Sequence, residues 1–274
     1  MKPAHQFAVG PQYGTTHIYV PQDKLDDFVA SFTGTLGGSA TPASEAQVTP
    51  TQSSTLFRAV RTPSGAVSAF GFKTPIPYPF GLERTGYLVT DMDGAVAAAK
   101  QAGASVIVTP FPDAIGRDAI IQWPGGVNMQ LYWHTKATTS LPLQTSPENR
   151  IYLSPDRADA FVRSFIAFSQ GTVTSDIATA PGLEIGRPGN TYRRIRIASQ
   201  FGNLAVLVTD GHLPYPYGHE TTGYEVADLM ATLDRASASH AKILVTPYTA
   251  GQRQAAMIEF PGGYIAEIHA PAKN

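Results

Sequence analysis

The sequence contains no cysteine and little charge. Among 274 residues, charged side chains make up 15%, and 20 lysines and arginines nearly balance 21 aspartates and glutamates, so the net charge is −1. The lack of cysteine excludes a disulfide framework, a thiolate zinc site and a cysteine nucleophile. The lack of a positive excess removes the attraction that nucleic-acid and anionic-membrane binders use. The composition favours a small-molecule ligand as partner, with no nucleic acid and no membrane.

Long apolar runs are also missing. None is long enough to cross a bilayer, and residues 1–10 lack the apolar core of a signal peptide. We therefore expect a cytoplasmic protein, although a removed leader would leave no trace. The length suffices for two domains with packed cores.

What the chain does have is an internal repeat, the feature to look for first. Three pairs of segments correspond, the first at an offset of 133 residues and the others at 137: His17–Val20 with Arg150–Leu153, Pro77–Tyr87 with Pro214–Tyr224, and Trp123–Gly126 with Phe260–Gly263. The chain is a tandem duplication. Because it already contains two copies, we expect a monomer or a weak homodimer.

Each half divides again into two similar units. A unit starts with a short strand-like run and continues into an amphipathic helix, as the apolar spacing of residues 25–32 shows. Gly103 ends the second helix in a left-handed cap, and His240 takes that place in the fourth. Three strand-like runs follow, the last two joined by Pro-Gly-Gly. The pattern predicts an α+β protein of four βαβββ units with curled mixed sheets, in two domains at 11–137 and 147–272.

This pattern resembles the vicinal oxygen chelate superfamily, which includes the glyoxalase I, bleomycin-resistance and extradiol dioxygenase families. The resemblance covers nearly the whole chain and rests on the helix start at Asp91–Ala95, the stop at Gly103 and the ending at Glu267. It implies two glyoxalase-like domains with helices on the outer faces of their sheets. Segments 38–54 and 169–188 are less regular, and we expect loops and an edge hairpin there.

The resemblance also implies a divalent metal ion with open positions, which a substrate chelates through two neighbouring oxygens. Carried over, the closing-strand ligands are Glu267 and Gln130. The usual opening-strand histidine falls at Thr15, but His17 lies two residues along on the same face. Arg150 stands at the matching position of the third unit, and a guanidinium cannot bind a cation.

Two interpretations of these residues remain open. Either a metal site uses at least Glu267 or His17, or no metal is bound, Arg150 pairs with Glu267, and His17 hydrogen-bonds Gln130; we favour the second. In both interpretations, we expect the side chains of His17, Gln130, Arg150 and Glu267 to meet at the bottom of one cup formed by the curled sheets.

The resemblance implies a glyoxalase/lyase-like enzyme acting on a small oxygen-rich or carbonyl substrate. Glu267 would be the general base or a ligand, with His17 as the second catalytic group. The expected substrate-binding residues are Arg150, Gln130, Tyr19, Tyr152, Tyr224, Tyr78 and Tyr215. The alternative is a non-catalytic protein that sequesters an aromatic compound, which 12 tyrosines, 13 phenylalanines and the incomplete ligand set favour.

One basic run stands out at residues 192–196. Strand alternation places Arg194 and Arg196 on one face and Arg193 on the other. This is either an anion clamp or an edge strand protected by charge, and we favour the edge strand. The turns at 116–118 and 251–253 are assigned no chemistry.

Overall fold

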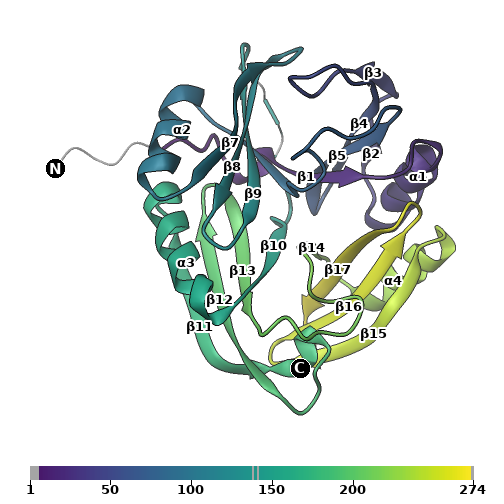
Figure 1. The fold of residues 1–274 in the computed structure, drawn as a ribbon. Coiled ribbons are helices and arrows are strands. Elements are labelled where there is room, and N and C mark those ends of the chain that lie inside the picture. The colour runs from purple at the N-terminus through teal and green to yellow at the C-terminus, as the bar shows by residue number, and fades with distance from the viewer. Residues whose placement is uncertain (1–5, 138, 141, 273–274) are drawn as a thin grey trace.

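The computed structural model describes residues 6–137, 139–140 and 142–272. Half of residues 1–10, which were considered above as a signal peptide, therefore lies outside the described residues. The described residues form two curled mixed sheets with four α-helices (Figure 1). The first sheet consists of β1 (Gly14–Tyr19), β2 (Ser39–Ala40), β3 (Ser44–Ala46), β4 (Thr55–Thr62), β5 (Gly65–Phe72), β6 (Thr85–Leu88), β7 (Ser105–Pro112), β8 (Gly116–Trp123) and β9 (Val127–His134). The second consists of β10 (Glu148–Leu153), β11 (Thr172–Pro181), β12 (Thr191–Ser199), β13 (Gly202–Val208), β14 (Thr221–Glu225), β15 (Lys242–Ala250), β16 (Arg253–Phe260) and β17 (Tyr264–Pro271). The helices are α1 (Leu25–Leu36), α2 (Met92–Gln101), α3 (Pro155–Ser169) and α4 (Leu229–Ala238), with short 3-10 turns η1 (Pro11–Tyr13), η2 (Gln22–Lys24) and η3 (Gly182–Ile185).

The strand pairing confirms the four βαβββ units. The first strand of each unit pairs in parallel with a later strand of the same unit: β1 with β5, β6 with β9, β10 with β13, and β14 with β17. Antiparallel pairs β1–β6 and β10–β14 then join two units into each sheet. Each sheet therefore has its two opening strands side by side in the middle.

Local sequence explains where the helices begin and end. The side chains of Asp91 and Asp228 accept hydrogen bonds from backbone amides at the starts of α2 and α4. After these helices, Gly103 and His240 have φ values of +102° and +67°, which confirms the predicted caps.

The helices lie between the two sheets. One core cluster packs α2 and α3 together with strands of both sheets, and another does the same with α1 and α4. The outer faces that carry the helices are therefore turned toward each other, and each half of the chain completes the core of the other (Figure 1). No helix among the described residues is long and apolar enough to span a membrane.

The edge of the second sheet is β11, and the prediction that the basic run forms an edge strand needs correction. The stretch 169–188, expected to hold loops and an edge hairpin, contains the ten residues of β11, which pair antiparallel with β12 as the edge strand of the second sheet. The basic strand β12 is therefore not an edge strand. Its arginines do not serve to protect an unpaired edge.

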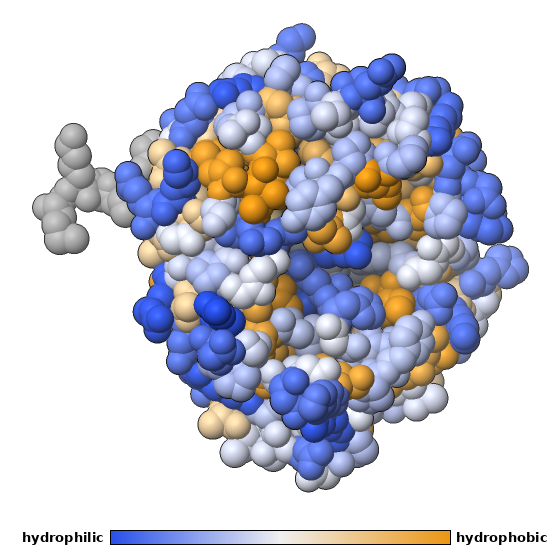
Figure 2. Space-filling view, viewed as in Figure 1, coloured by the Kyte–Doolittle hydropathy of each residue, from blue (hydrophilic) through white to orange (hydrophobic). Residues whose placement is uncertain are grey.

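Alternation along the strands leaves one face of each sheet free of helices. On β1, Ile18 enters the core while His17 and Tyr19 face the other way; on β10, Ile151 enters the core while Arg150 and Tyr152 face away from it. We call these inner, curled faces the first cup, of strands β1–β9, and the second cup, of strands β10–β17. Figure 2 shows a hollow with hydrophilic side chains over the region of β10, β14 and β17.

Candidate functional site

The four residues predicted to share one floor belong to two separate sheets. His17 and Gln130 lie on β1 and β9 in the first cup, and Arg150 and Glu267 lie on β10 and β17 in the second. The prediction of a common floor is wrong because each sheet is made only from the two units of its own half. The chain thus has two candidate sites.

The floor of the second cup is an ionic cluster. Arg150 Nη1 lies 2.7 Å from Glu267 Oε2 and 3.2 Å from Glu148 Oε1. Arg253 Nη1 lies 2.8 Å from Glu148 Oε1 and 3.4 Å from Glu267 Oε1. The ion pair predicted between Arg150 and Glu267 is confirmed.

Both carboxylates of this cluster are held ionised. Burial alone would raise the pKa of Glu267, but the attraction of Arg150 and the contacts with His269 and Arg253 outweigh it and lower the pKa to about 2. The same balance lowers the pKa of Glu148, where burial is outweighed by Arg253 first and Arg150 next. A carboxylate with so low a pKa is a weak base at neutral pH. The role of Glu267 as general base stays a prediction, and its surroundings suit an ion-pair partner better.

The second cup does not fit a metal ion. At the floor, where the resemblance implies a ligand, the guanidinium of Arg150 already occupies the position next to Glu267. Both glutamates of the floor are committed to arginines, and a cation brought there would face the charges of Arg150 and Arg253. We derive no chemistry through a metal at this site.

The first cup holds a different set of groups at the same places. His17 and Glu83 are buried, with Nδ1 of His17 3.6 Å from Oε1 of Glu83. Tyr19 donates a hydrogen bond to that same oxygen, while the other oxygen of Glu83 and Nδ1 of His17 have no hydrogen-bond partner. The imidazole of His17 lies over Gly86 of β6, where an added Cβ would be only 2.6 Å from Nε2. The glycine therefore makes room for the imidazole ring.

Asp118 lies beside Gln130 on the wall of the first cup. It is 6% exposed and sits on β8, in register with Tyr132 of β9. Burial, with the nearby Asp113 and Glu83, raises the pKa of Asp118 to about 8 although Gln130 hydrogen-bonds it. At neutral pH this carboxyl group is mostly protonated and able to donate a proton.

The first cup does not fit a metal ion either. Glu83 is tied to the Tyr19 hydroxyl, and Gln130 is a neutral amide engaged with Asp118. Among residues 6–137, 139–140 and 142–272, no three His, Cys, Asp or Glu side chains are grouped so that they could hold a metal ion. The predicted hydrogen bond between His17 and Gln130 is not found; His17 has Glu83 as its polar neighbour.

The predicted substrate-binding tyrosines lie in different surroundings. Tyr19 and Tyr152 are half-buried at equivalent places in the two cups. Tyr224 is fully buried in the core against Phe32, so the prediction that it contacts substrate is wrong. Tyr78 and Tyr215 are 76% and 70% exposed on loops, and their roles stay predictions.

Sequence reasoning missed Asp118 and Arg253, which it assigned to turns without chemistry. Both lie within the first few residues of a strand, β8 and β16, that starts directly at the turn. Counting alternate residues back along these strands from their Pro-Gly-Gly hairpins would have placed both on the inner faces. The alternation that places them was present in the sequence, but both residues had been assigned to the turns that precede the strands.

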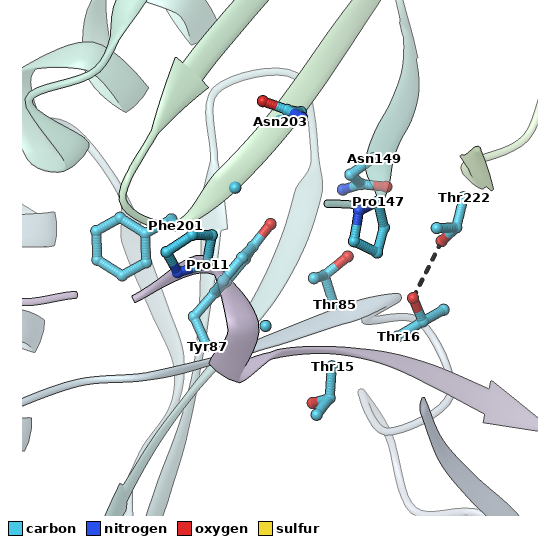
Figure 3. Close-up of a pocket in the computed structure, with 12 residues that line it drawn as sticks. Pro11, Thr15, Thr16, Thr85, Tyr87, Pro147, Asn149, Phe201, Asn203 and Thr222 are labelled. Atoms are coloured by element: carbon cyan, nitrogen blue, oxygen red, sulfur yellow. Dashed lines mark hydrogen bonds between the residues drawn. The ribbon is translucent and has the colours of Figure 1, made fainter. Parts of the chain in front are cut away.

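The small pocket between the two sheets is not a third site of this kind. It has a volume of about 20 Å³ and lies where β1, β6 and β10 approach one another (Figure 3). Thr16 and Thr222 share a hydrogen bond of 3.4 Å beside it, and Asn149 donates one of 2.8 Å to Glu220. Such a volume holds about one water molecule, not a substrate.

The fold of the chain is known from other proteins, although no family model and no curated protein matches its sequence. A mutant of 4-hydroxymandelate synthase from Streptomyces coelicolor superimposes with a TM-score of 0.61 at 12% identity, covering 99% of this chain and 94% of the other. The chain has the fold of the vicinal oxygen chelate superfamily. For the Mn(II)-bound glyoxalase from Novosphingobium aromaticivorans the TM-score is 0.56 at 13% identity, over 97% and 83% of the two chains. For 2,2',3-trihydroxybiphenyl 1,2-dioxygenase from Sphingomonas wittichii it is 0.58 at 14% identity, over 95% and 90%.

At such low identities, these vicinal oxygen chelate structures establish the fold and leave the chemistry to the residues of this chain. Those residues differ between the two cups. The first offers buried groups that could exchange protons, and the second offers fixed charges.

Proposed function

We propose that the chain is a glyoxalase/lyase-like enzyme that moves a proton on a small carbonyl or other oxygen-rich compound, and that the first cup is its active site. The observation that carries this proposal is the buried carboxyl group of Asp118, whose pKa burial raises, on the same inner face as His17 and Glu83. Ionisable groups with shifted pKa values on the concave face of a sheet are typical of active sites.

Each group has a role that follows from its contacts. Asp118, oriented by Gln130, donates a hydrogen bond to the substrate's carbonyl oxygen. His17 takes a proton from the neighbouring carbon, and the C–H electron pair then forms the enol double bond as the oxygen accepts the proton of Asp118. Glu83 lies next to Nδ1 and stabilises the imidazolium that results. When the neighbouring carbon carries a hydroxyl group, this enol is an enediol. Its second hydroxyl group then gives its proton to the ionised Asp118 while the imidazolium of His17 returns a proton to the former carbonyl carbon, which completes an isomerisation.

The aromatic wall of the first cup suits a planar substrate. Tyr19 stacks on Phe70 at 5.2 Å and on Phe72 at 6.1 Å, and Phe57 packs on Phe70 at 5.5 Å between ring centres. The same wall supports a second candidate, in which the cup binds an aromatic compound without turning it over.

Hydrogen–deuterium exchange at carbon separates the two candidates. Phenylpyruvate and hydroxyacetone, incubated with the protein in D₂O and followed by proton NMR, should lose their α-carbon proton signals faster than in buffer. His17→Asn and Asp118→Asn should each slow this exchange about 100-fold or more. The control is Arg117→Gln, because Arg117 is the neighbour of Asp118 on the outer face and pairs with Asp93. It should exchange like the unchanged protein.

The same experiment with EDTA tests the metal-free assignment. We expect identical rates with and without the chelator, since neither cup fits a metal. Ligand-induced shifts in the protein spectrum without any exchange would favour the second candidate. Exchange that survives both His17→Asn and Asp118→Asn would remove the first cup as its site.

A further inference from the structure

The inner face of the second cup holds a cluster of charged groups in which one arginine is only weakly paired. This face brings together four arginines and three glutamates: Arg150, Arg194, Arg196, Arg253, Glu148, Glu184 and Glu267. A further glutamate, Glu225, faces His269 at 3.8 Å and is more exposed, so the four arginines have only the three buried glutamates as partners. A partly buried charge without a full partner is costly, and a bound anion removes that cost.

The carboxylates are already committed to three of the arginines. Glu184 binds Arg194 and accepts a further hydrogen bond from Tyr192. Glu267 binds Arg150, and Glu148 accepts two hydrogen bonds from Arg253, of 2.8 and 3.2 Å. The fourth arginine, Arg196, therefore takes part in none of these close ion pairs.

Arg196 is the cation left with the least compensation. Its Nε lies 3.3 Å from Glu148 but makes no hydrogen bond, and its side chain is 26% exposed. The like charges of Arg253 and Arg194 lie close enough to add to the effect of burial, which lowers the pKa of Arg196. This guanidinium faces the cup with hydrogen-bond donors to spare.

Tyrosines form the wall next to these arginines. The hydroxyl of Tyr152 is buried and has no hydrogen-bond partner, and Tyr217 and Tyr248 lie near Arg150 and Glu267. Aromatic rings beside a guanidinium accommodate a flat apolar body, while the free hydroxyl supplies one more polar contact.

We propose that the second cup is an anion-binding site for aromatic carboxylates, in which Arg196 holds the carboxylate and the tyrosine wall holds the ring. A guanidinium fork matches a carboxylate in shape as well as in charge. The site lies on the other sheet from the first cup and does not depend on the reaction proposed there.

Isothermal titration calorimetry with benzoate and its neutral isostere benzamide tests the site. Benzoate should bind about tenfold or more tightly than benzamide, because charge-assisted hydrogen bonds are lost with the charge. Arg196→Gln should weaken benzoate binding by about tenfold or more. The matched control is Arg193→Gln on the opposite face of β12, where Arg193 pairs with Asp159 and Asp176; it should bind benzoate like the unchanged protein.

Three results would overturn the proposal. They are equal benzoate affinity in Arg196→Gln and the unchanged protein, equal affinity for benzoate and benzamide, and no binding of benzoate up to about 10 mM. Benzoate binding lost in His17→Asn but kept in Arg196→Gln would place the ligand in the first cup and overturn it as well. If Arg196→Gln does not fold, Arg196→Lys keeps the charge without the fork and should still weaken benzoate binding.

Discussion

The two cups have the same strand order, but they differ in the ionisation of their buried carboxyl groups. Where the second cup has the ion pair of Arg150 and Glu267, the first has His17 and Gln130 at the equivalent strand positions. Where the first has Asp118 next to Tyr132, the second has Ala255 next to His269. The first cup keeps a carboxyl group protonated, and the second keeps its carboxylates ionised.

This difference shows what duplication allows. A single sheet cannot easily hold a protonated acid and a dense arginine cluster side by side, because nearby guanidinium groups lower a carboxyl pKa. Two copies of the scaffold separate these environments by the thickness of the core. Proton transfer in one cup and anion binding in the other are thus compatible within one chain.

The largest expected effect follows from breaking the ionic floor of the second cup. Arg150→Met removes the shortest ion pair of the buried Glu267 and leaves it the longer contact to Arg253 and the neighbouring His269, so it should lower the free energy of unfolding by about 3 kcal/mol. His17→Met at the equivalent place of the first cup should cost about 1 kcal/mol, because its imidazole makes no hydrogen bond through Nδ1. Urea unfolding of both variants measures the difference, and equal losses would contradict the comparison.

Acid should weaken the ionic floor of the second cup. The folded pKa of Glu267 is about 2 and its ordinary value 4.5, so its stabilisation is complete above pH 4.5 and is lost as the pH falls toward 2. The loss amounts to about 3 kcal/mol. Thermal unfolding from pH 6 to 2 should show a shallower acid decline in Glu267→Gln than in the unchanged protein. Asp234→Asn, at an exposed position of α4, should keep the original decline.

Most of the fold could be predicted from the sequence because periodic patterns encode it locally. The apolar spacing in α1, the caps at Gly103 and His240, and the Pro-Gly-Gly hairpins each depend on a few neighbouring residues. Alternation along β12 likewise placed Arg194 and Arg193 on opposite faces of the strand, as the structure has them. These features depend on neighbouring residues and not on contacts with distant parts of the chain.

The site was harder to predict because it depends on which units share a sheet. Nothing near Arg150 in the sequence shows that β10 pairs with β14 rather than with a strand of the other half. The orientation of equivalent loops also diverged: Glu83 turns toward Tyr19, whereas Glu220 turns toward Asn149. Such choices are made by packing over long sequence distances.

The two equivalent glutamates should respond differently to neutralisation. Burial raises the pKa of Glu220 to about 7, so the folded chain holds this proton more tightly than the unfolded chain, and stability falls as the pH rises from 4.5 to 7. Glu220→Gln removes that loss and should stabilise the protein by about 1–2 kcal/mol at pH 8, with little change at pH 4.5. Glu83→Gln should not stabilise, since it weakens the hydrogen bond from Tyr19. Urea unfolding at both pH values distinguishes them, and a destabilised Glu220→Gln at pH 8 would refute the assignment.

The smallest effect comes from a single methyl group at the centre of each cup. An added Cβ at Gly86 would lie 2.6 Å from Nε2 of His17, whereas at Gly223 the nearest atoms, in Arg150 and His269, are 3.3 Å away. Gly86→Ala should therefore displace the imidazole ring at a cost of about 1 kcal/mol, while Gly223→Ala should cost less because its neighbours need to move only slightly. The chemical shifts of His17 report the displacement directly. If they change in Gly86→Ala and carbon exchange slows with them, the position of the ring matters for chemistry in the first cup. Unchanged exchange with a displaced ring would instead remove His17 from the reaction.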